Sequence, residues 1–400
     1  MTFASLIKRK KFKYEVMLCT DGRWIIEGIL DDETEATTFA RKVLVRKKGD
    51  EVKIIRCRKT KKGQTFTSEI FHEKRARPKE PPITLGEVSA DHPVCQIAGD
   101  VFTLDSVLTI SRLLRPFLIR NSITATELLH GWVYIRRLID AGSLFGSATH
   151  RMASVQAAAE NITPKERLAV LEKIVRDVVA RARDLVAERK RVPRPDDGAL
   201  DFISQRIQAR FEPTEHAYVL MTVLTQKFQG ASSISHKLDQ LLQFLECDLE
   251  PWQRAPLESM AAECLDYAEV IQELFGPQPH LASFLCRLAD VVNDKPADEK
   301  GISNASLVLI RRLIANGGAP QCRKVLIDRL VRELTSGKPL DRRSPEKEKH
   351  WLAIVLRDFK RSDGTVLGGA KVEQAISVRK KRLRQQELRR LGLIEAADAL

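Results

Sequence analysis

The chain has 400 residues, 43% of them hydrophobic and 30% charged, and a formal net charge of +14 at pH 7. This ordinary globular composition predicts two or three domains around substantial apolar cores. The longest apolar runs, at 307–310 and 352–356, are far shorter than the roughly 20 residues of a membrane helix, which argues against a transmembrane segment. The N-terminal residues do not have the pattern of a secretory signal, so we expect a cytoplasmic protein.

The positive charge is concentrated at the two ends of the chain. Residues 1–80 contain 21 Lys and Arg against 12 Asp and Glu, and residues 371–400 contain 8 against 4. The 290 residues between them hold 38 basic against 37 acidic side chains and are close to neutral. A basic balance suits a nucleic-acid partner, but here it describes the ends of the chain and not its centre.

Residues 1–72 predict a compact, basic ββαββ module. Two runs with strand alternation, 13–19 and 23–30, flank an Asp-Gly pair, which is a strong hairpin signal. After this hairpin the apolar spacing becomes helical, and two further strand-like runs follow at 51–58 and 64–71. One helix would then cover one face of a four-stranded antiparallel sheet.

Basic side chains cluster in this module and again near the C-terminus, and they are the candidate polyanion-binding residues. These candidates are Lys8, Arg9, Lys10, Lys11, Arg56, Arg58, Lys59, Lys61, Lys62, Arg379, Lys380, Lys381 and Arg384. The alternative is that lysines on short edge strands provide solubility and block edge pairing. The ββαββ order differs from that of the common RNA-binding modules, and no RNP-type aromatic motif is present.

The chain after the module predicts a linker and then a large all-α body. Residues 73–93 hold four prolines and mixed charge without periodicity. The predicted helices cover 103–121, 125–141, 143–160, 164–191, 198–211, 214–229, 233–246, 252–274, 279–293, 303–316, 320–336, 345–360 and 370–391. A Pro- and Asp-rich break divides this body into a first bundle, 94–192, and a second, 198–400. An irregular stack of helical hairpins is an alternative, although no fixed-period repeat is present.

The longest predicted helix, 164–191, carries an apolar seam with alternating steps of three and four residues. The seam residues are Leu168, Leu171, Val175, Val178, Ala182 and Leu185. Such a heptad pattern suits either a helical bundle or a coiled-coil dimer. Further apolar residues widen the stripe, which favours burial in a bundle over pairing with a second chain.

The last predicted helix, 370–391, reads as an amphipathic closing helix. Ile376, Leu383 and Leu391 share one side of it with Leu388 near them, and we expect that side to dock on the bundle. The basic candidates of this segment spread over the remaining surface. They would act on a ligand if the N-terminal module presents its own lysines beside them.

Motifs for catalysis, metal binding or cofactor binding do not stand out. The seven cysteines are scattered without a CxxC pair, and no two of the eight histidines share an i, i+4 helical face. The serine-hydrolase, protein-kinase and P-loop motifs are absent from the sequence. We therefore expect no metal, no cofactor and no enzymatic activity.

These observations leave three hypotheses for function. The absence of catalytic motifs favours a non-enzymatic cytoplasmic adaptor or regulatory protein that acts through protein contacts of the module and of the helical body. The alternative is binding of nucleic acid or another polyanion through the basic ends, which would weaken steeply with salt. A third hypothesis is peripheral attachment to an anionic membrane through the short apolar and lysine-rich N-terminus.

Overall fold

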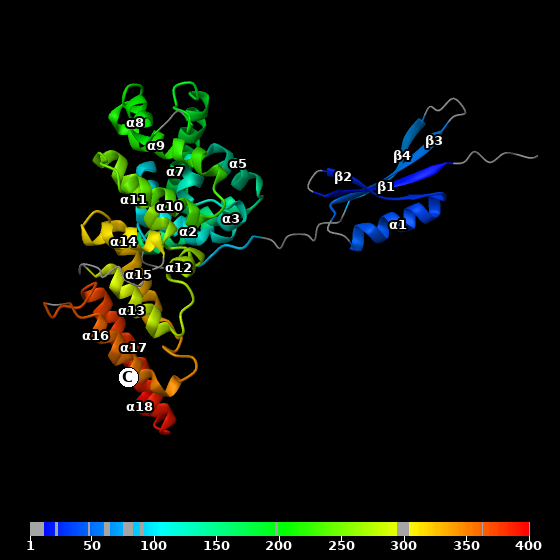
Figure 1. The fold of residues 1–400 in the computed structure, drawn as a ribbon. Coiled ribbons are helices and arrows are strands. Elements are labelled where there is room, and N and C mark those ends of the chain that lie inside the picture. The colour runs from blue at the N-terminus through cyan, green and yellow to red at the C-terminus, as the bar shows by residue number, and fades with distance from the viewer. Residues whose placement is uncertain are drawn as a thin grey trace, which may run out of the picture. The chain divides into compact units, whose positions relative to one another are not determined.

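The structure, a computed structural model, describes residues 12–20, 23–46, 49–59, 65–74, 83–88, 92–196, 199–293, 304–361 and 363–399. Its contacts divide the chain into two compact units, Met1–Pro82 and Ile83–Leu400. The first unit contains a four-stranded antiparallel sheet with one helix, and the second is built mainly of helices (Figure 1). The predicted α+β fold, a small ββαββ module followed by a large helical body, is therefore confirmed.

The N-terminal unit packs one helix against one face of its sheet. Its elements are β1 Lys13–Thr20, β2 Arg23–Leu30, α1 Glu33–Arg46, β3 Glu51–Lys59 and β4 Thr65–Lys74, with the strand order β2-β1-β3-β4. Thr20 pairs with Arg23, as the predicted hairpin requires. Strand alternation places Val16 and Leu18 on the side of α1, where they share a core with Ala40. Figure 1 shows α1 lying along one side of the sheet.

The second unit is a succession of helices. They are α2 Leu104–Leu113, α3 Arg115–Asn121, α4 Ala125–His130, α5 Trp132–Asp140, α6 Leu144–Glu160, α7 Pro164–Ala187, α8 Leu200–Gln208, α9 His216–Lys227, α10 Ile234–Leu245, α11 Pro251–Cys264, α12 Ala268–Phe275, α13 Leu281–Val292, α14 Ala305–Ala315, α15 Pro320–Thr335, α16 Glu348–Asp358, α17 Ala370–Arg390 and α18 Ile394–Asp398. Short 3-10 turns lie at Ala98–Phe102 (η1), Pro213–Glu215, Phe228–Gly230 and Pro345–Lys347. Within the described residues, no helix is both long and apolar enough to cross a membrane.

Two of the long predicted helices are interrupted for local steric reasons. The helix predicted over 103–121 is divided near Pro116, which lies in the first turn of α3 because proline has no N–H to donate within a helix. The helix predicted over 125–141 is divided at Gly131, whose backbone is extended, with φ −115° and ψ 102°. A side chain does not fit there, because a Cβ atom would lie 2.9 Å from the carbonyl oxygen of Glu127. A third predicted helix, 252–274, is divided into α11 and α12 at residues 265–267.

The apolar cores of the helical unit follow the predicted division of the body in part. One core collects buried side chains of α2 to α7, and a larger one collects those of α8 to α17 together with Leu108 and Val192. The contacts nevertheless group Ile83–Leu400 as one compact unit, so the existence of two separate bundles stays a prediction. The end of the predicted linker joins this unit, because the Gly86 N–H donates to the Leu113 carbonyl oxygen at 2.8 Å.

A buried ion pair joins the two halves of the helical unit. The Lys237 ammonium group of α10 lies 2.7 Å from the Glu127 carboxylate of α4, and both side chains are at most 1% exposed. The same ammonium group donates to the Ser122 carbonyl oxygen at 2.7 Å. Buried charges are costly unless they are paired and hydrogen-bonded, and this pair meets both conditions.

A second buried carboxylate, that of Glu263 at the end of α11, caps the N-terminus of α4. Its oxygens accept hydrogen bonds from the Ala125 N–H, the Thr126 N–H and the Thr126 hydroxyl group. Burial outweighs these bonds and raises the pKa of Glu263 to about 7. The folded protein therefore binds a proton at Glu263 more tightly than the unfolded chain does.

This pKa predicts a specific dependence of stability on pH. As the pH rises from 4.5 to about 7, the unfolded chain loses the Glu263 proton before the folded protein does, so the free energy of unfolding falls. The Glu263 contribution to this fall is on the order of 3 kcal/mol. Glu263→Gln should remove this contribution to the pH dependence. Urea unfolding of the wild type and of the variant, at an acidic and at a mildly alkaline pH, measures the difference. Equal pH dependence in the two proteins would contradict the assignment.

Candidate functional site

Most of the predicted basic residues of the N-terminal module cannot be placed on a surface. Lys8, Arg9, Lys10, Lys11, Lys61 and Lys62 lie outside the residues that the structure describes, and so does the side chain of Lys59. Arg56 and Arg58 lie on β3 and are half-buried. The Arg56 guanidinium group lies 5.2 Å from the centre of the Phe12 ring, so a neighbouring aromatic side chain already contacts it.

Arg379, predicted to bind a polyanion, is instead buried inside the helical unit. Its side chain is 4% exposed, and its Nε donates to the Glu348 carboxylate at 3.1 Å. Its remaining nitrogens donate to the carbonyl oxygens of Leu334, at 3.0 Å, and Lys338, at 2.8 Å. The prediction for Arg379 as a surface residue is therefore wrong, because its guanidinium group is used to join α17 to α15 and α16.

The other basic candidates of α17 are exposed, as predicted. Lys380, Lys381 and Arg384 all face solvent, and Arg384 lies 3.5 Å from the Glu387 carboxylate. On the opposite side Ile376 is buried and Leu383 is half-buried, whereas Leu391 is 69% exposed and does not dock. Leu388, which the helical pattern placed near this side, is buried.

A basic groove of about 330 Å³ runs between α17 and the segment that follows α15. We call it the α17 groove. Its basic side chains are Lys338, Arg379, Arg382, Arg389 and Arg390, and its acidic side chain is Glu348. Arg382 donates to the carbonyl oxygens of Thr335, at 3.0 Å, and Ser336, at 2.7 Å, which fixes α17 against the C-terminal end of α15. The groove is thus built on residues whose own positions are held by hydrogen bonds.

A second groove, of about 780 Å³, adjoins the first one. We call it the α13 groove because it lies beside the N-terminus of α13. Its basic side chains are Arg329, Lys338, Arg342 and Arg343, and its acidic side chains are Glu333 and Asp341. The two grooves share Lys338 and Pro339, so they meet at the segment between α15 and α16.

Together the two grooves hold eight basic and three acidic side chains. Part of this positive charge is already used, since Arg379 is buried against Glu348 and Arg389 lies 2.8 Å from Asp398. Arg342, Arg343 and Arg390 are exposed and form no ion pair within the described part of the chain. These three side chains are therefore the ones most available to an anionic ligand.

Sequence reasoning missed most of this surface. The grooves combine residues of 329–343 with residues of 379–390, and helical periodicity gives no sign that these segments adjoin. The Arg-Arg pair at 342–343 was visible as a local charge run within a nearly neutral region. Two adjacent arginines in a turn between helices are a sequence signal for a basic surface, and this signal lies outside the two ends of the chain.

The sheet face opposite α1 is a second candidate surface. Residues of this face alternate with the buried ones along β1, and the β2 residues paired with them lie on the same face. The apolar side chains on it are Met17, Trp24, Ile26, Ile29 and Ile55, of which Ile26 is 50% and Ile29 57% exposed. The Lys53 ammonium group lies 4.2 Å from the centre of the Trp24 ring, which gives this apolar face a basic margin.

The predicted seam of the longest helix, α7, is buried within the helical unit. Leu171, Val178 and Ala182 are buried, and Leu168, Val175 and Leu185 are half-buried. The seam packs against α5 and α6 of the same chain. Its side chains are therefore occupied by intramolecular contacts.

The described residues contain no group of three or more His, Cys, Asp or Glu side chains arranged to hold a metal ion. Burial raises the pKa values of the Cys264 and Cys322 thiols and lowers that of His130 to about 4. These groups are consequently neutral near pH 7, as buried core residues are.

Comparison with known proteins finds no matching family, no matching curated protein and no matching solved structure.

The burial of Arg379 leads to a prediction about stability. Arg379→Met leaves the Glu348 carboxylate without its guanidinium partner, so we expect the free energy of unfolding to fall by about 3 to 5 kcal/mol. The matched control is Lys380→Met, the exposed neighbour on the same helix, which should change it by less than about 0.5 kcal/mol. Urea unfolding of both variants measures the difference, and similar small effects in both would show that Arg379 is a surface residue.

Proposed function

We propose that the helical unit binds a nucleic-acid strand through the α17 and α13 grooves. The observation that supports this proposal is that Arg342, Arg343 and Arg390 are exposed and form no ion pair within the described residues, in two grooves that meet at Lys338 and Pro339. A strand with regularly spaced phosphates can contact both grooves at once. Neutralising several phosphates releases counterions and supplies most of the affinity in such complexes.

The types of side chain in the grooves also favour a phosphate ligand. Seven of the eight basic residues are arginines, and a guanidinium group can donate two parallel hydrogen bonds to one phosphate. The α13 groove is also lined by His280 and Phe284, which are half-buried and pack on Trp351 and Phe275, and we propose that their remaining ring surfaces stack with unpaired bases. We therefore propose a single strand as the ligand, because its bases are free to stack.

Replacing the available arginines should test this proposal directly. The triple variant R342E/R343E/R390E reverses three exposed charges of the grooves and should weaken binding of a single-stranded 20-mer by at least about tenfold. The control R176E/R183E reverses two exposed charges on α7, far in sequence from the grooves, and should change binding by less than about twofold. Fluorescence anisotropy of a labelled oligonucleotide measures both.

Salt provides a second readout of the same experiment. With about five phosphate contacts, the logarithm of the wild-type binding constant should fall with the logarithm of salt concentration with a slope of about −3.5. Binding that is insensitive to salt, or equal losses in the two variants, would contradict the proposal. Binding to anionic vesicles with none to the oligonucleotide would instead favour a membrane surface as the ligand.

The second candidate function is a protein-contact role of the N-terminal unit, as in a cytoplasmic adaptor. It is favoured by the exposed Ile26 and Ile29 on the sheet face opposite α1. The variant I26K/I29K should lose a protein partner while it keeps its affinity for the oligonucleotide. Loss of oligonucleotide binding in this variant would mean that the sheet face belongs to the nucleic-acid surface.

A further inference from the structure

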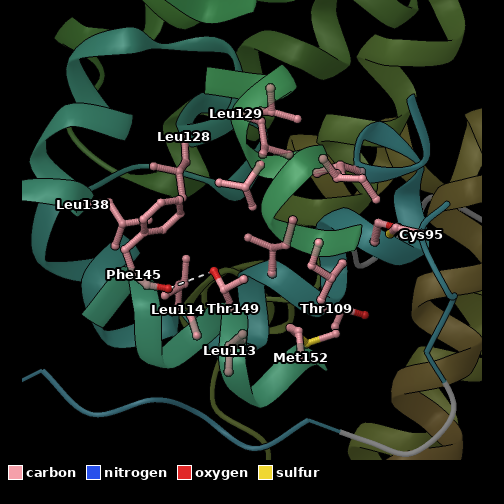
Figure 2. Close-up of a pocket in the computed structure, with 18 of the residues that line it drawn as sticks. Cys95, Thr109, Leu113, Leu114, Leu128, Leu129, Leu138, Phe145, Thr149 and Met152 are labelled. Atoms are coloured by element: carbon pink, nitrogen blue, oxygen red, sulfur yellow. Dashed lines mark hydrogen bonds between the residues drawn. The ribbon is translucent and has the colours of Figure 1, made fainter. Parts of the chain in front are cut away.

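An apolar cavity of about 150 Å³ lies among the first helices of the helical unit. Figure 2 shows side chains of its lining, which come mainly from α2, α4, α5, α6 and α7, with Cys95 from the segment before η1, and point toward one space. Leu114, Leu128, Leu138, Ile174 and Val178 are among the buried residues that line it. Charged side chains do not contribute to the lining. The cavity is built from α2 to α7, whereas the two basic grooves are built from α12 to α17.

The few polar side chains of the lining already have partners within the chain. The Thr109 hydroxyl donates to the Asp105 carbonyl oxygen at 2.8 Å, and the Thr149 hydroxyl donates to that of Phe145 at 3.1 Å. The Gln156 amide donates to the Pro93 carbonyl oxygen at 3.1 Å. The remaining polar groups, the Cys95 thiol and the Ser106 hydroxyl, lie 3.5 Å apart. Water would find few free partners in this cavity, because a buried water molecule usually makes about three hydrogen bonds.

We propose that this cavity binds one small, uncharged, apolar molecule. A void of this kind deprives its lining of dispersion contacts, and an apolar ligand restores them. A charged ligand would lose its hydration without gaining a partner. An aliphatic-lined cavity of about 150 Å³ holds a molecule the size of benzene, so the ligand has about six carbon atoms.

The half-buried part of the cavity lining includes side chains of α2 and α6. These side chains are Thr109, Ile110, Phe145, Thr149 and Met152. Changes of rotamer at these positions can admit a small molecule without a movement of the helices. The proposal is independent of nucleic-acid binding, since no residue of the grooves lines the cavity.

Thermal unfolding of the full chain with benzene and with benzoate tests the proposal. A saturating apolar ligand stabilises the folded state, so benzene should raise the Tm by about 2 °C or more. Benzoate has the same ring but carries a charge, and it should give no rise. Absence of a shift with benzene, or an equal shift with benzoate, would overturn the proposal.

Two variants locate the binding site. Ala148→Leu on α6 adds three carbon atoms to the cavity and should abolish the benzene shift, whereas an unchanged shift would place benzene elsewhere. Leu138→Ala enlarges the cavity and should allow naphthalene to raise the Tm, which it should not do for the wild type. If Ala148→Leu does not fold, the naphthalene comparison decides, and equal responses of Leu138→Ala and wild type would refute the cavity as the site.

Discussion

The basic surface of the helical unit depends on the buried interaction between Arg379 and Glu348. Arg379 reaches from α17 to the Glu348 carboxylate at the start of α16 and to backbone carbonyl oxygens at the end of α15. The other oxygen of Glu348 accepts a hydrogen bond from the Leu340 N–H at 2.7 Å. One ion pair therefore fixes both sides of the segment at which the two basic grooves meet. The exposed arginines can be presented to a ligand because this buried arginine holds their backbone in place.

A buried carboxylate with guanidinium partners is also present where the halves of the helical unit meet. The carboxylate of Asp266, which is 1% exposed, accepts hydrogen bonds from Arg112 and Arg115 on one side and Arg332 on the other. Burial alone would raise the pKa of Asp266, but the hydrogen bond from Arg112 and the positive charges of Arg332, Arg112 and Arg115 outweigh it and lower this pKa. A buried charge with several partners tolerates few alternative arrangements, because each partner lost leaves an uncompensated charge. We infer that such groups specify how the helices pack more than they stabilise the fold.

Local signals in the sequence indicated most of the helices and strands, although three long predicted helices are divided in the structure, and they did not indicate the sites. The predicted start of the longest helix at residue 164 is confirmed by α7, and Thr163 and Glu166 cap this helix with reciprocal hydrogen bonds. Arg379 was misplaced because a helical pattern separates apolar from polar faces but cannot identify an arginine that reaches a carboxylate 31 residues away in the chain. The grooves and the apolar cavity were not predicted for the same reason, since each is assembled from segments whose proximity depends on tertiary packing.

Amide hydrogen exchange of the full chain, measured with and without a single-stranded oligonucleotide, tests the proposed binding of nucleic acid where the two grooves meet. Binding there should slow the exchange of backbone amides in residues 336–343 and in the second half of α17, because phosphates would contact the arginines of these segments. Protection confined to the N-terminal unit, with unchanged exchange in these two segments, would contradict it.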